Sequence, residues 1–358
     1  MPCLIPEILF EIGKKLIEDG NSDTVIQFAL SGKQQFQAME NVFASATALK
    51  LYADHFIIGW ENKLCYFPNN RLAKLLLNSN GNRVDTLFIE KYIPEYQSVF
   101  DKIAEKKQYI PEYQSVFDRI AEKKQLTAVY VSYKFSSNPS YIIDCLTILS
   151  SSLKNMTIPN CFMNEIFRDS FKLKSLTLTE FNDFQYLNFC CKTDILEFTS
   201  DFDVYQLFSD LDLDMKSFQC SPHLSSVKQM TFSGSFFKQW FHLKCDKLMD
   251  WFSSIEIFKF NIVTKPVDNR LRAFDISCFL SILKHYIKLF IDNIKEATKV
   301  PPKINVTFLK VGFMNFDDCK FICQDFDVSE SNSTFYCFEK TIKSAGSEST
   351  ILGIQIAR

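Results

Sequence analysis

Cysteine and histidine are the side chains with which this sequence could bind a metal ion. The chain has 12 cysteines and 4 histidines, but no two cysteines have the C-x-x-C spacing that is typical of zinc sites. Only the adjacent Cys190 and Cys191, and the nearby Cys319 and Cys323, lie close together, and the histidines are far from them in sequence. We therefore expect buried, reduced thiols in a protein that binds no metal and no other cofactor.

Closely spaced carboxylates are a second possible set of metal ligands. Asp210, Asp212 and Asp214 have the alternating spacing of a calcium-binding loop. However, leucines stand between them, and the glycine and the terminal glutamate of such a loop are missing. We interpret these aspartates, and the pair Asp317 and Asp318, as solvated turns or strand edges.

The sequence lacks the motifs of common catalytic sites: G-x-G-x-x-G, G-x-x-x-x-G-K-[ST], G-x-S-x-G and H-E-x-x-H are all absent. Glycine, which lets the backbone approach phosphates closely, occurs only 9 times in 358 residues, whereas phenylalanine occurs 37 times. The net charge of -2 argues against a general nucleic-acid-binding protein, which needs a basic excess. These features favour a packed scaffold without catalytic residues over an enzyme.

The N-terminal segment does not resemble a secretory signal, because it has no basic region before an apolar core and it contains acidic residues. No apolar run approaches the roughly 18 residues of a membrane-spanning helix. We expect a protein of the cytoplasm or the nucleus whose partners are neither membranes nor nucleic acids.

The first 50 residues predict three short helices. Pro6 stands where a helix can begin without losing a needed N–H donor. The cluster 19–22 predicts a turn, with Ser22 or Asp23 capping a second helix, and a third helix is expected over 36–51. The first two helices carry apolar residues at helical spacing: Ile5, Ile8, Leu9, Ile12 and Leu16 in the first, and Val25, Ile26, Ala29 and Leu30 in the second.

Beyond residue 50, a short template of the form apolar-x-x-apolar-x-apolar recurs in β-prone surroundings. Its central residues are mostly spaced about 20 to 29 residues apart, which is the period of leucine-rich repeats. Phenylalanine often takes the place of leucine, so we expect it to fill an irregular core. The template fits Val84–Leu87–Ile89, Leu126–Val129–Val131, Leu153–Met156–Ile158 and Leu173–Leu176–Leu178, and less closely Thr193–Leu196–Phe198, Met215–Phe218–Cys220, Val227–Met230–Phe232 and Ile255–Phe258–Phe260.

Residues 92–108 and 109–125 are a tandem duplication that differs only at Lys102 and Arg119. Removing one copy restores the ordinary repeat spacing, so we expect the duplication in the helical return of one repeat. Pro111 favours two short helices, or one packed and one protruding, over a single straight helix. We interpret it as a neutral duplication at the protein surface.

The C-terminal third predicts a long helix over 275–297, a strand over 304–308 and a closing β-hairpin of 334–342 and 351–356. An aromatic-rich helix is also expected over 236–252.

These patterns together predict an α/β protein. A three-helix module occupies 1–50. Over 51–358 follows an irregular leucine-rich-repeat-like α/β solenoid, with the C-terminal β-hairpin as its cap.

The N-terminal module resembles an F-box. That family opens with Leu-Pro-x-Glu-[Ile/Leu]-Leu, which stands here as Ile5-Pro6-Glu7-Ile8-Leu9, and its second helix ends near a small, a basic and an aromatic residue, here Gly32, Lys33 and Phe36. The whole chain is similar to nematode-type F-box proteins, which pair a short F-box with an irregular leucine-rich-repeat-like or F-box-associated C-terminal region. The C-terminal hairpin is similar to the end of such associated domains.

The resemblance implies the substrate-recognition subunit of a Skp–cullin–F-box ubiquitin ligase. In such a complex the first helices dock into a Skp-type adaptor, the rest of the chain binds a target protein, and catalysis takes place on other subunits. The alternative is a stand-alone leucine-rich-repeat-like scaffold for protein interactions without a ubiquitin ligase role. The adaptor-binding residues that the resemblance implies are Ile5, Pro6, Ile8, Leu9, Ile12, Leu16, Val25 and Ile26.

The alternation of side chains along the repeat strands predicts which residues would face a target protein. Where the apolar residues of the template point inward, their neighbours point outward. The predicted face is polar and is not strongly charged. It comprises Asn155, Thr157, Ser175, Thr177, Thr179, Glu197, Gln229 and Thr231, and Lys259 follows by the same rule.

Overall fold

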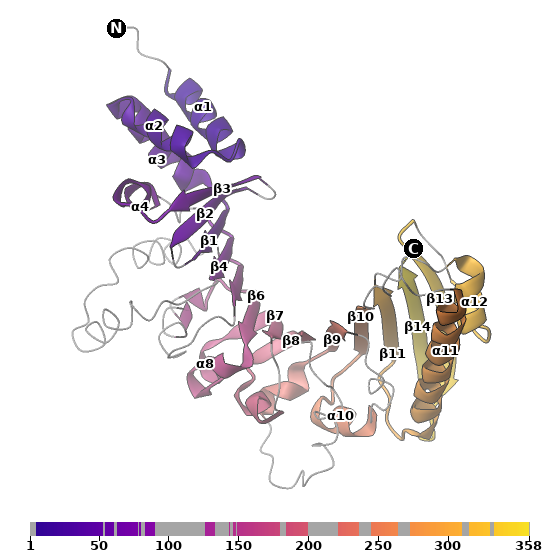
Figure 1. The fold of residues 1–358 in the computed structure, drawn as a ribbon. Coiled ribbons are helices and arrows are strands. Elements are labelled where there is room, and N and C mark those ends of the chain that lie inside the picture. The colour runs from indigo at the N-terminus through magenta and orange to yellow at the C-terminus, as the bar shows by residue number, and fades with distance from the viewer. Residues whose placement is uncertain are drawn as a thin grey trace. The chain divides into compact units, whose positions relative to one another are not determined.

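A computed structural model describes residues 5–52, 54–60, 63–77, 79, 83–89, 126–132, 143, 146–147, 149–179, 184–199, 221–235, 245–263, 273–309, 315–329 and 333–357. Within these residues the chain forms eight α-helices and a mostly parallel sheet of fourteen strands (Figure 1). The predicted α/β class is therefore confirmed. The tandem duplication at 92–125, the template fit at 215–220 and the aspartates at 210–214 lie outside the described residues.

The chain divides into two compact units. The first comprises Met1–Phe162 and Asp169–Leu173, and the second comprises Met163–Arg168 and Lys174–Arg358. The first unit combines the N-terminal helices with the first strands of the sheet. The predicted domain boundary between residues 50 and 51 stays a prediction.

The three predicted N-terminal helices are present as α1 (Pro6–Glu18), α2 (Ser22–Leu30) and α3 (Lys33–Ser45). Pro6 occupies the start of α1, as expected. Gly20 follows the end of α1 with a φ of +76°, in the left-handed region that favours glycine. The cap of α2 is Asn21 rather than Ser22 or Asp23, since the Thr24 N–H donates to the Asn21 side-chain oxygen at 3.2 Å.

The prediction that the third helix reaches residue 51 is wrong. α3 ends at Ser45, because Ala46 adopts an extended backbone with a ψ of 138°. Residues 48–51 instead form a strand in which Leu49 and Leu51 are buried while Lys50 lies on the opposite face. The apolar residues of this stretch fit both the helical period and the two-residue period of a strand, so their spacing alone does not separate the two structures.

The strands of the first unit lie in the order β6-β5-β4-β1-β2-β3. β1, β2 and β3 form an antiparallel meander, which the sequence patterns did not predict, and β4, β5 and β6 continue from β1 as parallel neighbours. The predicted template residues Leu87, Val129 and Met156 are register partners and are buried. The bounds are β1 (Ala48–Leu51), β2 (His55–Trp60), β3 (Lys63–Pro68), α4 (Arg71–Leu77), β4 (Thr86–Ile89), β5 (Ala128–Val131), β6 (Asn155–Pro159) and the 3-10 helix η2 (Asn160–Phe162).

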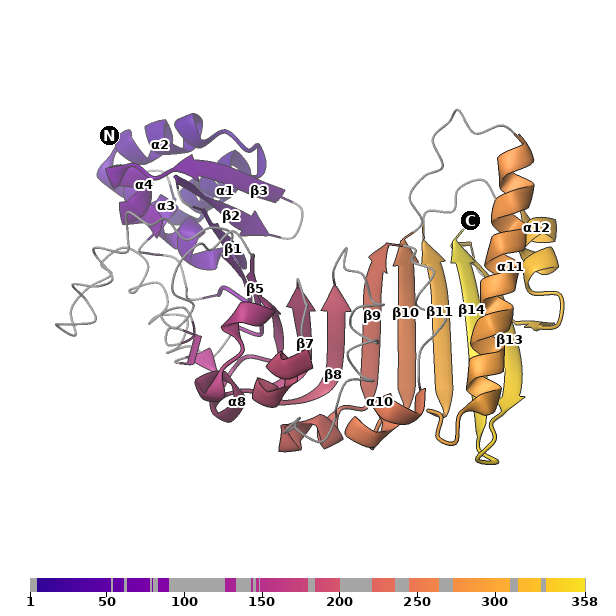
Figure 2. The same ribbon diagram turned by 60° about the horizontal axis from the view of Figure 1, so that its bottom comes forward.

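The strands of the second unit lie in the order β7-β8-β9-β10-β11-β14-β13-β12. Figure 2 shows β9, β10, β11 and β14 side by side and running in the same direction. The predicted C-terminal hairpin is confirmed as the antiparallel pair of β13 and β14. The strand bounds are β7 (Lys172–Thr179), β8 (Lys192–Thr199), β9 (Gln229–Ser235), β10 (Ile257–Val263), β11 (Lys303–Leu309), β12 (Asp327–Val328), β13 (Phe335–Lys343) and β14 (Ser349–Ala357).

Helices accompany these strands. The predicted long helix is present as α11 (Ala273–Glu296), which runs alongside β13 and β14 (Figures 1 and 2). Of the helix expected over 236–252, α10 (Cys245–Trp251) covers the end, and 236–244 lie outside the described residues. The others are α8 (Glu165–Ser170), α12 (Phe316–Ile322) and the 3-10 helices η3 (Phe184–Phe189) and η6 (Pro222–Ser226).

Phenylalanine fills much of the core of the second unit, as predicted. Phe198, Phe232 and Phe260 come from β8, β9 and β10, and their rings stack with centroid distances of 5.2 and 5.5 Å. Phe290 of α11 meets Phe260 edge-on at 5.7 Å. Stacked and edge-to-face rings at these distances stabilise a core beyond the area that they bury.

Gly13 lies where α1 packs on α3, in a space too small for a larger side chain. A Cβ at residue 13 would lie 2.6 Å from Sδ of Met39 and 3.1 Å from Cγ2 of Val42. We expect Gly13→Leu to lower the free energy of unfolding by about 1–3 kcal/mol, the usual cost of overpacking, in urea denaturation. Lys15→Leu is the control, because it adds the same side chain on the exposed side of α1; an equal loss in both variants would contradict the close packing.

Candidate functional site

The apolar stripe predicted on α1 divides between two faces of the helix. Of the predicted residues only Leu9 is buried; it lies with Gly13 and Ile17, which the stripe did not include, on the side that packs against α3. Ile5, Ile8 and Ile12 point away from this core and are 59%, 45% and 38% exposed. One row of the stripe therefore stabilises the helical module, and the other remains available to a partner.

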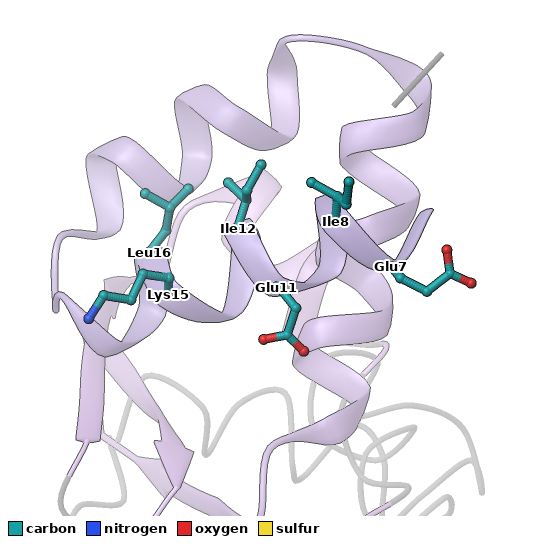
Figure 3. Close-up of a pocket in the computed structure, with 6 residues that line it drawn as sticks. All are labelled: Glu7, Ile8, Glu11, Ile12, Lys15 and Leu16. Atoms are coloured by element: carbon teal, nitrogen blue, oxygen red, sulfur yellow. The ribbon is translucent and has the colours of Figure 1, made fainter. Parts of the chain in front are cut away.

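Ile8 and Ile12 of the exposed row line a shallow groove of about 510 Å³, together with Leu16. In Figure 3, Ile8, Ile12 and Leu16 point to the same side of α1, and Glu7 and Glu11 point away from them. Lys15 completes the lining, and the surface inside the groove is almost entirely apolar. The groove is thus an apolar strip bordered by two carboxylates and one ammonium group.

The remaining residues implied for adaptor binding lie in different surroundings. Pro6 is exposed at the start of α1. Val25 of α2 is fully buried, and Ile26 is half-buried. Leu30, at the end of α2, is 66% exposed. Leu9 and Val25 therefore belong to the core that holds α1 and α2 in place.

Polar contacts hold α1 against the β2–β3 hairpin. The Lys63 ammonium donates a hydrogen bond to the Glu18 carboxylate at 2.8 Å, and this bond lowers the pKa of Glu18. The Lys14 ammonium lies 5.6 Å from the centre of the Trp60 ring, and the Trp60 indole N–H donates to the Ser45 carbonyl at 2.9 Å. The Lys63–Glu18 pair is exposed, so it orients α1 more than it stabilises it, whereas the part-buried Trp60 bond joins the hairpin to α3.

The residues predicted to face a target lie on the side of the sheet opposite the apolar core. Asn155 and Thr157 belong to β6 in the first unit, and the others belong to β7, β8 and β9 of the second unit. Asn155 is exposed, whereas Ser175, Thr177, Thr179, Glu197 and Gln229 are half-buried, and Thr231 is only 4% exposed.

Hydrogen bonds join the polar side chains of the second unit from strand to strand. Glu197 accepts hydrogen bonds from the hydroxyl groups of Thr177 at 3.4 Å and Ser233 at 2.9 Å, and the Asn261 amide donates to the Ser233 hydroxyl at 3.1 Å. The Gln229 amide donates to the Thr231 hydroxyl at 3.2 Å. This network fixes the orientation of the polar groups before any partner binds.

A further surface, exposed at Tyr66 and Tyr130 and half-buried between them, was not predicted from the sequence. Tyr66, Ile57, Lys50, Phe88 and Tyr130 are register partners across β3, β2, β1, β4 and β5, and they lie on the face opposite the core of the first unit. The alternation of Leu49, Lys50 and Leu51 could have indicated the first strand of this surface. The same residues also fit the helical period, so the strand was not recognised.

The cysteines of the described residues do not form a reactive or metal-binding site. Seven are buried and Cys161 is exposed. Burial raises the pKa of Cys190 and Cys245 to about 12 and that of Cys65 to about 11. No group of three or more histidine, cysteine or acidic side chains that could hold a metal ion occurs in the described part of the chain. Among the helices described, none is long and apolar enough to cross a membrane.

No protein-family model matches the sequence, and the search of curated proteins finds no similar one. Two features of the molecule remain as pointers to its function, the exposed isoleucine row of α1 and the polar face of the sheet.

The thiol environments predict which cysteines react. A thiol with a raised pKa forms less thiolate, the reactive species, at a given pH. At pH 8.5 we expect iodoacetamide to alkylate Cys161 in the native protein well before Cys190 and Cys245, as measured by peptide mass spectrometry. Unfolding in urea should remove the difference. Equal rates in the native protein would contradict the burial of Cys190 and Cys245.

Proposed function

We propose that this chain is the substrate-recognition subunit of a ubiquitin ligase of the Skp–cullin–F-box type. The observation that carries the proposal is the row of Ile5, Ile8 and Ile12, exposed along the first helix of an N-terminal three-helix module. Burying one such side chain contributes about 1.5–3 kcal/mol. A row of three therefore favours association with another protein, and a helix lying in an apolar groove is a common way to bury it.

Because the N-terminal module resembles an F-box, we infer that the partner that buries this row is a Skp-type adaptor. Under the proposal, Ile5, Pro6, Ile8, Ile12 and Leu16 contact the Skp-type adaptor, and Ile26 borders the contact. Leu9 and Val25 act indirectly, because they form the core that positions α1 and α2. The two carboxylates beside the groove, Glu7 and Glu11, would meet basic groups of the adaptor.

The sheet supplies the surface that would bind the target. The parallel strands of each unit follow one another mostly in chain order, and the central template residues pair in register. Both features support an irregular leucine-rich-repeat-like solenoid. The hydrogen-bonded polar groups around Glu197 are prearranged to recognise a protein surface, and the ubiquitin transfer itself would take place on other subunits.

The proposal predicts that Ile8→Asp/Ile12→Asp abolishes adaptor binding. Each aspartate removes an apolar contact and places a charge in the interface, so we expect affinity to fall by at least about a hundredfold. Purified full-length chain and the Skp-type adaptor would be compared by co-purification and calorimetry. Leu9→Asp is unsuitable as a test, because Leu9 is buried and its replacement would unfold the module.

Ile166→Asp/Ile282→Asp is the matched control. These isoleucines of α8 and α11 are 47% and 40% exposed, almost the same as Ile8 and Ile12, but they lie outside the N-terminal module. The control should bind the adaptor like the unaltered chain. If the unaltered chain does not bind the adaptor, the ligase role is wrong, and the stand-alone scaffold becomes the better interpretation. Equal binding by both double variants would show that α1 is not the contact.

A further inference from the structure

The first unit carries an aromatic row on the open face of its sheet, formed by Tyr66, Ile57, Lys50, Phe88 and Tyr130. These residues are successive register partners, so one side chain from each of five neighbouring strands lies in a line across the strands. The next partner of Tyr130 is Thr157, one of the residues predicted to face a target. Thr157 of β6 therefore extends the row by one strand within the first unit.

The rings of this row are accessible and are not needed by the core. Tyr66 is 47% exposed and Tyr130 is 41% exposed, although both belong to regular strands. The core lies on the other face, where Phe56 and Phe67 stack at 5.3 Å and Phe43 of α3 meets Phe67 edge-on. Large exposed aromatic side chains that no core requires are typical of protein interfaces.

Contacts between neighbouring side chains hold the rings in place. His55 lies between Tyr52 and Tyr66, with ring centroids 4.1 and 4.4 Å away. The Lys50 ammonium lies 5.9 Å from the centre of the Phe88 ring. A partner would therefore meet a preordered set of flat rings, which reduces the entropy lost on binding.

All three polar groups of the row can donate a hydrogen bond. The Lys50 ammonium can only donate, and the hydroxyl groups of Tyr66 and Tyr130 can donate to a carbonyl oxygen. The nearby Asp54 carboxylate lies 2.6 Å from Nδ1 of His55. Exposed rings with donors complement a proline-rich chain, because proline has no N–H, its ring packs flat on aromatic side chains, and the polyproline II backbone leaves its carbonyl groups open.

We propose that the aromatic row binds a proline-rich segment of a partner protein in the polyproline II conformation. Five strands about 4.8 Å apart place Tyr66 and Tyr130 about 19 Å from each other, which corresponds to about six residues at a rise of about 3.1 Å. A single lysine in the row does not favour a nucleic acid, which needs several cations along its phosphates. The proposal does not depend on adaptor binding, since either a ligase subunit or a scaffold can use this surface.

The test is fluorescence anisotropy of the full-length chain with a labelled polyproline peptide of about eight residues, without any adaptor present. We expect saturable binding that weakens about tenfold in Tyr66→Ala and again in Tyr130→Ala. Phe321→Ala is the matched control, because Phe321 of α12 is 48% exposed but lies in the second unit. Tyr66→Phe keeps the ring and removes the donor, so it should retain part of the affinity.

Three results would overturn the proposal. The first is the absence of saturable binding by a chain whose circular dichroism and melting temperature are normal. The second is an equal loss of affinity in Phe321→Ala and Tyr66→Ala. The third is displacement of the peptide by a short single-stranded uridine RNA that binds more tightly, which would assign the aromatic row to nucleic acid instead.

Discussion

The alternation of side chains along register-matched strands is the constraint on which most of this structure depends. Register partners point to the same side of a sheet, so one apolar residue per strand becomes a continuous buried row. In the second unit this row is Leu196, Met230, Phe258, Ile304 and Leu352. A slip of one residue in any of these strands would expose its apolar side chains to water. The same constraint gathers the polar and aromatic side chains on the opposite face, where a partner can reach them.

Much of the sheet could be predicted because its strands carry a local signal. The template centred on Leu87, Val129 and Met156 marks strands that do pair in register. The helix α11 could be predicted as well, because its apolar stripe is longer than any strand. The meander of β1, β2 and β3 was missed for a physical reason. Its first strand follows α3 after only two residues, and the apolar residues from Met39 to Leu49 satisfy the helical period without a break.

The candidate site was predictable in its location but not in its detail. Ile8 and Leu9 are adjacent and similarly apolar, so spacing does not reveal which one faces α3. The side that faces α3 is marked by Gly13, which packs against Met39 and Val42 of that helix. Gly13 was the available signal, since a glycine in mid-helix destabilises the helix unless a neighbour packs against it. The aromatic row could not be found in this way, because it combines residues from five strands that are distant in sequence.

The phenylalanine stack of the second unit runs across the strands, so it concerns the number of strands in the sheet. Phe198, Phe232 and Phe260 each come from a separate strand, with interplanar angles of only 22° and 9° between successive rings. Each ring needs only the ring on either side, so whole strands can be gained or lost without a change in the packing of the others. Phe290, tilted 81° to Phe260, ends the series. The core of this unit is therefore built from contacts between neighbouring strands, and no single ring fixes its width.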